Sequence, residues 1–271
     1  MKEIIIKPKK TLSINFKNLW FYRELFYFLA WRDIKVRYKQ TAIGILWAIL
    51  QPFLTMVIFS IFFGRIAGIT SGEIPYPIFT YFGLLFWQYF SSSLTSASNS
   101  LVTNQSLVQK IYFPRLILPI SATLVHLIDF FFAFLVLIGL MIYYQFTPTI
   151  IGILLLIPCL LITFLTFSGI GLILAAINIK YRDVRYVLPF FIQLLLFLTP
   201  VIYPVTILGK YQWLWFLNPI AAVIETIRTG FLGLTSINWQ LLGVSSIISI
   251  TIFIIGLIYF NKTEGKIVDL I

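Results

Sequence analysis

The chain has 271 residues, of which 60% are hydrophobic and only 11% are charged, and its formal net charge is +11. Soluble domains average roughly 45–50% apolar residues and about 25% charged residues, so this composition excludes an ordinary soluble globule. Half of the basic residues fall within the first 40 positions, directly before the first long apolar run. This placement suits anionic membrane lipids better than nucleic acid, so we expect a membrane protein that binds no nucleic acid.

The N-terminal region, residues 1–40, lacks the uninterrupted apolar core of a signal peptide because lysines interrupt it. We therefore expect it to be retained as a cytosolic tail. Residues 19–31 are rich in aromatic side chains, which sort onto two faces at 100° per residue. One face carries Phe21, Leu25, Phe26 and Phe28, together with Tyr22 and Leu29. The pattern predicts an amphipathic helix that lies in the membrane interface, and packing against another protein domain is the alternative.

Six apolar runs are long enough to cross the hydrocarbon core, which is about 30 Å thick and takes about 20 helical residues. They lie at residues 41–63, 76–100, 119–144, 150–177, 186–203 and 241–260. Six spans put both termini on one side, where 17 of the 20 Lys and Arg residues also fall. The positive-inside rule makes this side the cytosol. The sequence thus predicts an all-α integral membrane protein with one six-helix transmembrane domain, residues 41–271, after the cytosolic tail and interfacial helix.

The stretch between the fifth and sixth runs is too apolar for an ordinary loop. Asn218-Pro219 divides it into pieces of about 13 to 16 residues, each shorter than a span. We expect two re-entrant half-helices over about residues 204–233 that dip into the outer leaflet and are buried against protein. A seventh or eighth span is the alternative interpretation.

The chain contains no GxxxxGK[ST], HExxH, GxSxG or CxxC motif. We therefore expect no catalytic residue, no metal site and no cofactor in this chain, and a nucleotide that drives it would be bound by another chain. His126 and Asp129 share a helix face in the third run. They favour either a proton relay in a proton-coupled secondary transporter or a polar contact between helices. A membrane enzyme acting on lipid-linked sugars is a third interpretation, disfavoured because no acidic cluster is present.

The second run changes character halfway along. Eight of the ten residues from 91 to 100 are Ser, Thr or Asn, which lipid would penalise, so this half faces other helices or a polar path. Hydroxyls that bond back to their own helix are the alternative. Aromatic rings next to hydroxyls suit a sugar chain. The candidate glycan path comprises Tyr81, Phe82, Phe86, Trp87, Tyr89, Phe90, Ser92 and Ser96.

Two cytosolic loops have more shape than a linker needs. Residues 102–118 predict a short helix with Lys110 near its end, stopped before Pro114. In residues 178–186, three basic side chains surround Asp183. We expect a soluble partner to dock on both loops, although charges that only set the topology are the alternative.

Several motifs are shared with a known family. Trp31-Arg32-Asp33-Ile34-Lys35-Val36-Arg37-Tyr38-Lys39-Gln40-Thr41 is followed by Gly44, Leu46, Trp47 and Gln51-Pro52. Later come Lys-Ile-Tyr-Phe-Pro-Arg at 110–115, Tyr-Arg-Asp-Val at 181–184 and Leu-Asn-Pro at 217–219. This set, which extends over most of the chain, resembles ABC-2 type permeases that export polysaccharides, including O-antigen, capsule and teichoic acid carriers.

The resemblance implies a homodimer of six-span permeases in the bacterial inner membrane. It also implies two copies of a separate ATPase, which binds ATP and Mg and drives a lipid-linked polysaccharide, such as the O-antigen of lipopolysaccharide, across that membrane. The family's interfacial helix would match residues 19–31, and its outer re-entrant helices residues 204–233. Its coupling helix would match Asn104, Gln105, Ser106, Leu107, Val108, Gln109, Lys110, Ile111 and Tyr112, to which the second loop adds Arg182 and Asp183.

Overall fold

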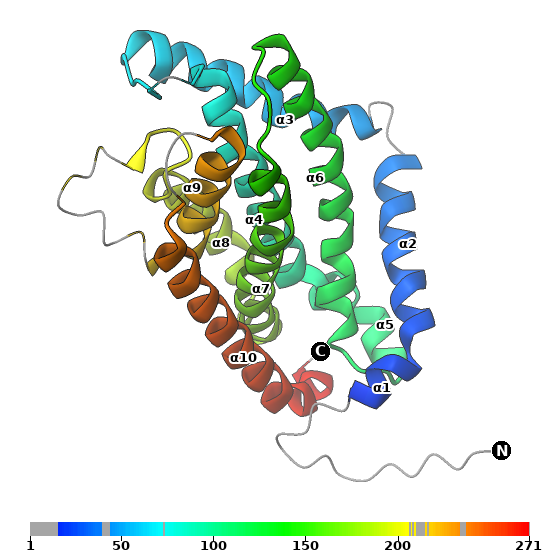
Figure 1. Cartoon of the computed structure of the whole chain (residues 1–271). Helices are drawn as coiled ribbons and strands as arrows, with labels where there is room; N and C mark the ends of the chain where they lie inside the picture. Colours follow the sequence, from blue (N-terminus) through cyan, green and yellow to red (C-terminus); the bar gives the residue numbers. More distant parts are fainter. Residues whose placement is uncertain are drawn as a thin grey trace.

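The structure is a computed structural model that describes residues 16–39, 44–72, 74–205, 207, 209, 215, 217–233 and 237–270. Within these residues every regular element is a helix, which confirms the predicted all-α fold (Figure 1). The helices are α1 (Phe16–Phe21), α2 (Arg23–Lys39), α3 (Gly44–Phe59), the π-helical η1 (Ser60–Ile66), α4 (Tyr76–Thr103), α5 (Gln105–Lys110), α6 (Ile117–Tyr143), α7 (Ile150–Lys180), α8 (Val184–Leu198), α9 (Pro219–Leu232) and α10 (Trp239–Leu270). Residues 1–15 of the predicted tail lie outside the described residues, as does much of the first predicted half-helix.

Four segments are long and apolar enough to cross a membrane, namely Leu46–Ile66, Ile117–Tyr143, Ile150–Lys180 and Trp239–Gly265. α4 is long enough at 28 residues, but its Ser, Thr and Asn residues lower its apolarity. α8 is apolar but has only 15 residues. A helix therefore occupies each predicted span, while the number of helices that cross the membrane stays a prediction.

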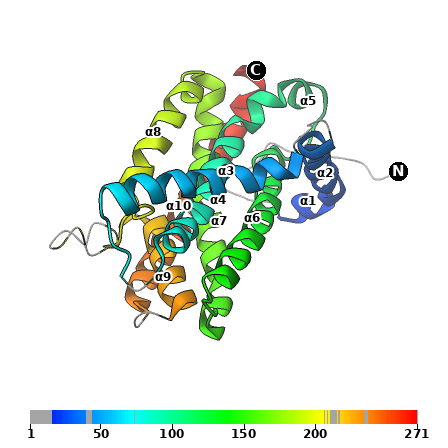
Figure 2. The same ribbon diagram turned by 90° about the horizontal axis from the view of Figure 1, so that it is seen from above.

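The centre of the bundle is formed by α4 and α7. α4 packs against α6 and α7, and α7 packs against α9 and α10. These helices run side by side, whereas α3 crosses them at a steep angle (Figures 1 and 2). We refer below to the α5 end of the bundle, where α1 and the end of α10 also lie, and to the opposite α9 end. Because neighbours surround α4, most of its side chains are buried.

α7 and α10 approach each other closely at a pair of glycines. A Cβ atom added at Gly256 would lie 2.3 Å from the carbonyl oxygen of Gly169. One added at Gly169 would lie 2.7 Å from the backbone of Ile252 and Phe253. Small residues at a helix crossing let two backbones pack directly, which is a main source of helix association in membranes.

Replacing Gly256 with Ala should separate these two helices, because the new methyl group meets backbone that has no flexible end to move. We expect a loss of about 2 kcal/mol in the free energy of unfolding, measured by denaturation in detergent. Gly243→Ala is the matched control on the same helix, since a Cβ there meets nothing within 4 Å. Equal stability of the two variants would contradict this packing.

α9 lies where the second of the two half-helices is predicted, and its re-entrant position stays a prediction. The Asn218 side chain accepts hydrogen bonds from the backbone N–H groups of Ile220 (3.1 Å) and Ala221 (3.4 Å), which caps the helix start, and Gly233 ends it at a φ of +66°. Fourteen helical residues extend only about 21 Å, less than the hydrocarbon core of about 30 Å. α9 is therefore too short to be a further span.

The N-terminal helix differs from the prediction in its extent, in the residues of its packed face and in its direction, while its contact with the membrane interface stays a prediction. The helix is interrupted at Tyr22. It then continues as α2 as far as Lys39, beyond the predicted end at residue 31. The face that packs on the protein carries Leu25, Phe26 and the buried Leu29, whereas Phe21 and Phe28 are 75% and 63% exposed. α2 also runs beside α6 instead of lying flat across the end of the bundle (Figure 1). The physical reason is a polar contact between the end of α2 and the middle of α6, described next.

Candidate functional site

Most hydroxyl groups in the polar half of α4 donate hydrogen bonds to backbone carbonyls of the same helix. Thr95 donates to the Ser91 carbonyl at 2.8 Å, Ser98 to that of Thr95 at 2.9 Å, and Ser100 to that of Ala97 at 2.7 Å. Back-bonding of this kind lets hydroxyl side chains sit inside a helix bundle at little cost. Several polar residues of this half also line a cleft.

This cleft lies between α2, α4 and α6 and has a volume of about 330 Å³. Its lining residues are Arg32, Asp33, Val36 and Arg37 of α2; Thr95, Ser96, Asn99, Ser100 and Thr103 of α4; the adjoining Asn104; and Ala122, Val125 and His126 of α6. Both predicted alternatives therefore hold for α4, because Thr95 and Ser100 bond to their own helix and also line this polar space.

The deep end of the cleft is closed by a network centred on Asp129. The Tyr38 hydroxyl donates a 2.6 Å hydrogen bond to one carboxylate oxygen, and the Arg37 guanidinium lies 2.7 Å from the other. His126 places Nδ1 3.2 Å from the same carboxylate and Nε2 2.6 Å from the Ser96 hydroxyl. Burial and the bond to Asp129 raise the pKa of Tyr38, so its phenol stays protonated and can donate. The network thus joins α2, α4 and α6.

At the other end of the cleft, an ion pair and a hydrogen bond of Arg32 join α2 to the end of α4. Arg32 pairs with Asp33 at 2.8 Å and donates to the Asn104 side chain at 2.8 Å. Both arginines that line the cleft therefore have a carboxylate partner. The cleft is lined by hydroxyl and amide groups; the His126 imidazole is bonded to Asp129 and Ser96, and the guanidinium charges are paired with carboxylates.

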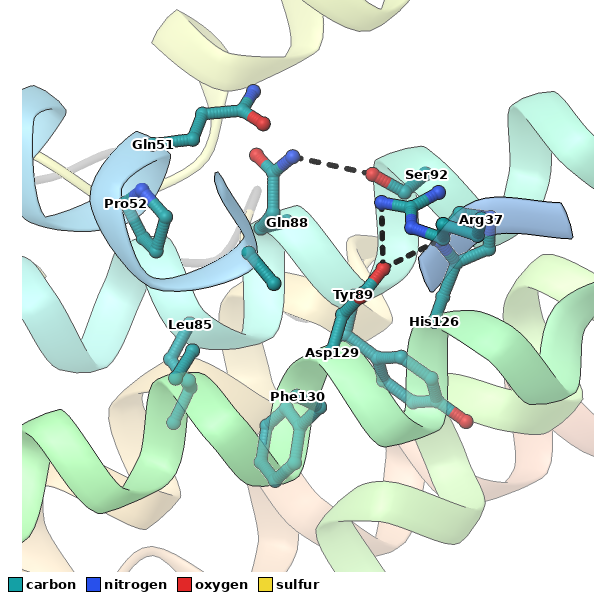
Figure 3. A pocket seen from close by; sticks show the side chains of 12 residues that line it. Arg37, Gln51, Pro52, Leu85, Gln88, Tyr89, Ser92, His126, Asp129 and Phe130 are labelled. Carbon is teal, nitrogen blue, oxygen red and sulfur yellow. Dashed lines mark hydrogen bonds and ion pairs between the residues drawn. The ribbon is translucent and has the colours of Figure 1, made fainter. Parts of the chain in front are cut away.

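A small hollow continues from Asp129 towards α3, where Arg37, Gln51, Gln88 and Ser92 meet (Figure 3). The Gln88 amide donates to the Ser92 hydroxyl at 3.2 Å. The volume of this hollow is about 20 Å³, which is room for one water molecule among polar groups. Polar side chains thus extend from Arg32 to Gln51, from the α5 end to the middle of the bundle.

Most of the aromatic residues predicted for the glycan path pack in the core; Tyr89 also borders the small hollow, and Phe90 borders a separate groove between α4, α7 and α8. All six, namely Tyr81, Phe82, Phe86, Trp87, Tyr89 and Phe90, are buried. Phe86 and Tyr89 pack on Phe130, with ring centroids 5.2 and 5.6 Å apart, and the Tyr81 hydroxyl donates to the Ala133 carbonyl at 3.0 Å. These rings form the core because α4 has neighbours on several sides. The predicted Ser92 and Ser96 do face polar cavities.

A short helix, α5, lies within the segment predicted to be the coupling helix, and the residues of this segment differ in their exposure. Val108 is buried in an apolar cluster with Leu101 and Phe113, and Asn104 is held by Arg32. The exposed group comprises Ser106, Gln109, Lys110, Ile111 and Tyr112, while Gln105 and Leu107 are half-buried. Arg182 and Asp183 are exposed in the α7–α8 turn, at the same end of the bundle. Asn104 and Val108 are therefore not available to a partner, and docking on the exposed residues stays a prediction.

The segment after α5 is fixed to the last helix by a contact that the sequence analysis missed. The backbone N–H of Arg115 donates to the nearly buried Glu264 carboxylate at 3.1 Å, and its guanidinium donates to the Glu264 backbone carbonyl. Glu264 lies 149 residues away, so no local pattern indicates this contact. This contact links the connection between α5 and α6 to α10.

Comparison with known proteins identifies the family. The family model described as ABC-2 type transporter matches residues 24–232, which includes α2 through α9. The chain belongs to the ABC-2 type transporter family. Family membership and the four long apolar helices make it a multi-pass membrane protein and a transporter permease subunit.

Relatives of this ABC-2 permease match over most of their length. An O-antigen export system permease protein RfbA of Klebsiella pneumoniae is 28% identical over 267 residues, which is 96% of this chain and 100% of that protein. RfbA of Myxococcus xanthus is 30% identical over 79% of this chain and 83% of its own length. The polysialic acid transport protein KpsM of Escherichia coli is 26% identical over 87% and 92%.

Proposed function

We propose that this chain is the permease subunit of an ATP-driven exporter that moves a lipid-linked polysaccharide across the bacterial inner membrane. The observation that carries the proposal is the match, from end to end, to permeases named for O-antigen export. The residues matched by the family model, 24–232, include all residues that line the α2–α4–α6 cleft and α5. If the chain exported another class of substrate, its similarity to O-antigen export permeases over nearly its whole length would need another explanation.

The chemistry of the cleft supports a glycan substrate. Sugar hydroxyls exchange hydrogen bonds with hydroxyl and amide groups, and these are what α4 offers in Thr95, Ser96 and Asn99. The adjoining arginines are already paired with Asp33 and Asp129, so the cleft presents neutral polarity rather than an unpaired positive charge. A glycan section that enters from the α5 end would meet these groups first.

The energy for export comes, in this proposal, from ATP and Mg on a separate ATPase that docks at the α5 end. The exposed residues Lys110, Ile111, Tyr112, Arg182 and Asp183 combine apolar and charged groups, as partner interfaces do. This end would face the cytosol, since Lys180, Arg185 and Lys262 also lie there. The complete exporter would contain two copies of this chain and two of the ATPase.

The purified chain alone should show no ATPase activity, because it lacks a loop that cradles phosphate. Co-expression with its cognate ATPase should yield a stable complex with two copies of each subunit, measured by mass determination in detergent. Nucleotide hydrolysis by the isolated permease would refute the division of labour. A complex that fails to form would refute the docking proposal.

Replacing Asp129 with Asn retains a hydrogen-bond acceptor for Tyr38 but removes the charge that pairs with Arg37. We expect a stability loss of about 1 kcal/mol and largely intact transport, because the network holds helices together. The exposed Glu24→Gln on α2 is the matched control for loss of a carboxylate. A variant that folds and binds the ATPase, yet loses transport together with dependence on a proton gradient, would show that Asp129 relays protons.

A further inference from the structure

α8 stands apart from the rest of the bundle along much of its length. Of its 15 residues only Leu188 is buried, while large apolar side chains such as Tyr186, Phe190 and Phe197 are exposed. Figure 2 shows α8 at the edge of the bundle. A spanning or embedded helix with so little contact leaves space between itself and its neighbours.

That space is a groove of about 380 Å³ between α8 on one side and α4 and α7 on the other. Its walls are apolar: Phe90 and Leu94 come from α4, Ile170 and Leu174 from α7, and Val184, Val187, Leu188, Phe191, Ile192 and Leu195 from α8. Polar groups line it only at one end, where Tyr181 and Asp183 lie in the α7–α8 turn.

The polar end of the groove is strongly basic. Lys180, Arg182 and Arg185 are all exposed around it, against the single carboxylate of Asp183. The Lys180 ammonium group lies 4.9 Å from the centre of the Tyr181 ring, which itself lines the groove. A negatively charged group at the mouth would therefore be attracted, while its apolar continuation would fit the walls behind it.

The length of the groove matches one leaflet of a bilayer. Its wall on α8 extends from residue 184 to residue 195, about 17 Å along the helix at 1.5 Å per residue. Half of the hydrocarbon core is about 15 Å. An acyl chain whose phosphate lies at the basic turn would thus end near the middle of the membrane.

A second protein helix fits the groove less well than a chain. A helix about 10 Å across and 17 Å long occupies on the order of 1,300 Å³, whereas the empty space between the walls of the groove is about 860 Å³. We propose that the groove between α4, α7 and α8 binds one acyl chain of an anionic glycerophospholipid, with its phosphate held by Lys180 and Arg185 at the α7–α8 turn. This site is independent of the substrate cleft, which lies between α2, α4 and α6.

The test measures lipid retention by the purified exporter in mass spectrometry from detergent, after exposure to equal amounts of phosphatidylglycerol and phosphatidylcholine. The wild-type exporter should retain phosphatidylglycerol preferentially. Val187→Trp, which fills the groove, should abolish this retention. Phe190→Trp is the matched control, because Phe190 is exposed on the same helix but does not line the groove.

The charge requirement is tested separately with Lys180→Gln/Arg185→Gln. Near a membrane each basic residue contributes about 1 kcal/mol to the binding of an anionic lipid, so the preference for phosphatidylglycerol should fall about 30-fold. Lys262→Gln, an exposed lysine on α10 at the same end, should leave the preference unchanged. Arg182 is kept in all variants so that the docking surface is intact.

A photoreactive phenylalanine at position 187 identifies the occupant. A covalent product with phosphatidylglycerol supports the proposal. A product with a second copy of the chain would make the groove an interface between copies, and one with the lipid carrier of the glycan would make it part of the export route; either overturns the proposal. Equal retention by the wild type and Val187→Trp would also overturn it. None of these readouts requires transport, so they stand apart from the outcome for the proposed function.

Discussion

Replacing Arg228 with Met should lower the free energy of unfolding by about 3 kcal/mol or more. Arg228 is buried at the α9 end, where its guanidinium donates to the backbone carbonyls of Phe79 (3.0 Å), Pro200 (2.5 Å) and Val201 (2.6 Å). The last two carbonyls follow the end of α8, where the helix no longer supplies donors. Without Arg228 these groups are buried and unpaired, and α9 loses its link to α4 and α8. Denaturation of the purified chain in detergent measures the effect.

Two further substitutions serve as controls and show whether the loss of stability comes from the hydrogen bonds of Arg228. Arg65→Met, an exposed arginine in η1, should change stability by about 0.5 kcal/mol at most. Arg228→Lys should be intermediate, because an ammonium group cannot reproduce the planar fork of donors. Gly83 belongs to the same arrangement, since a Cβ there would lie 2.4 Å from the Arg228 guanidinium. A stable Arg228→Met variant would show that these hydrogen bonds do not hold α9 in place.

Reversing the charge of the docking surface with Lys110→Glu, combined with Tyr112→Ala, should reduce export by about tenfold or more. Both side chains are exposed, so insertion and stability should remain normal. A charge reversal at a specific interface costs affinity and leaves like charges facing each other. Export and ATP hydrolysis are measured on the same preparation. We expect one of two results: ATP hydrolysis continues while export falls, or the ATPase dissociates from the permease.

The matched control for the docking surface is Lys262→Glu/Tyr143→Ala. It removes an exposed lysine at the α5 end and an exposed tyrosine at the end of α6. This pair should leave export unchanged. Replacing all of residues 107–111 would be a poorer experiment, because Val108 belongs to the buried core. Normal export by Lys110→Glu/Tyr112→Ala would contradict a coupling role for α5.

The positions of the helices were predictable from the sequence because their signals are local. The run predicted at 119–144 is α6 at 117–143, and the run predicted at 150–177 is α7 at 150–180. α9 begins at Asn218-Pro219 because an Asn side chain can cap the helix and Pro needs no donor at its first position. Such signals depend on neighbouring residues only.

The partners of the polar residues could not be predicted in the same way. Asp129 was recognised as unusual, and its contact with His126 follows from helical spacing, but Arg37 and Tyr38 lie more than 90 residues away along the chain. Arg228 lies in the predicted re-entrant region, and nothing in the sequence indicates that its buried guanidinium binds the backbone carbonyls of Phe79, Pro200 and Val201. Distant contacts of this kind are set by tertiary packing, on which apolarity and charge in the sequence carry no information.

The aromatic residues of α4 illustrate a second limit. Aromatic side chains suit lipid, protein core and sugar stacking equally well, so composition alone does not separate these environments. The rings of Phe82 and Phe86 lie in the core because Phe231 and Phe130 pack against them. In contrast, Ser96 faces the cleft, where His126 binds it.

The most direct measurement of the proposed function uses vesicles that contain this chain together with its ATPase. Lipid-linked polysaccharide is supplied on the side that carries the ATPase, and its appearance on the other side is followed with a glycan-specific lectin. We predict transfer that requires ATP, both subunits and the lipid-linked form of the glycan. Transfer by the permease without the ATPase, driven by a proton gradient, or no transfer by an intact complex that hydrolyses ATP, would contradict the account.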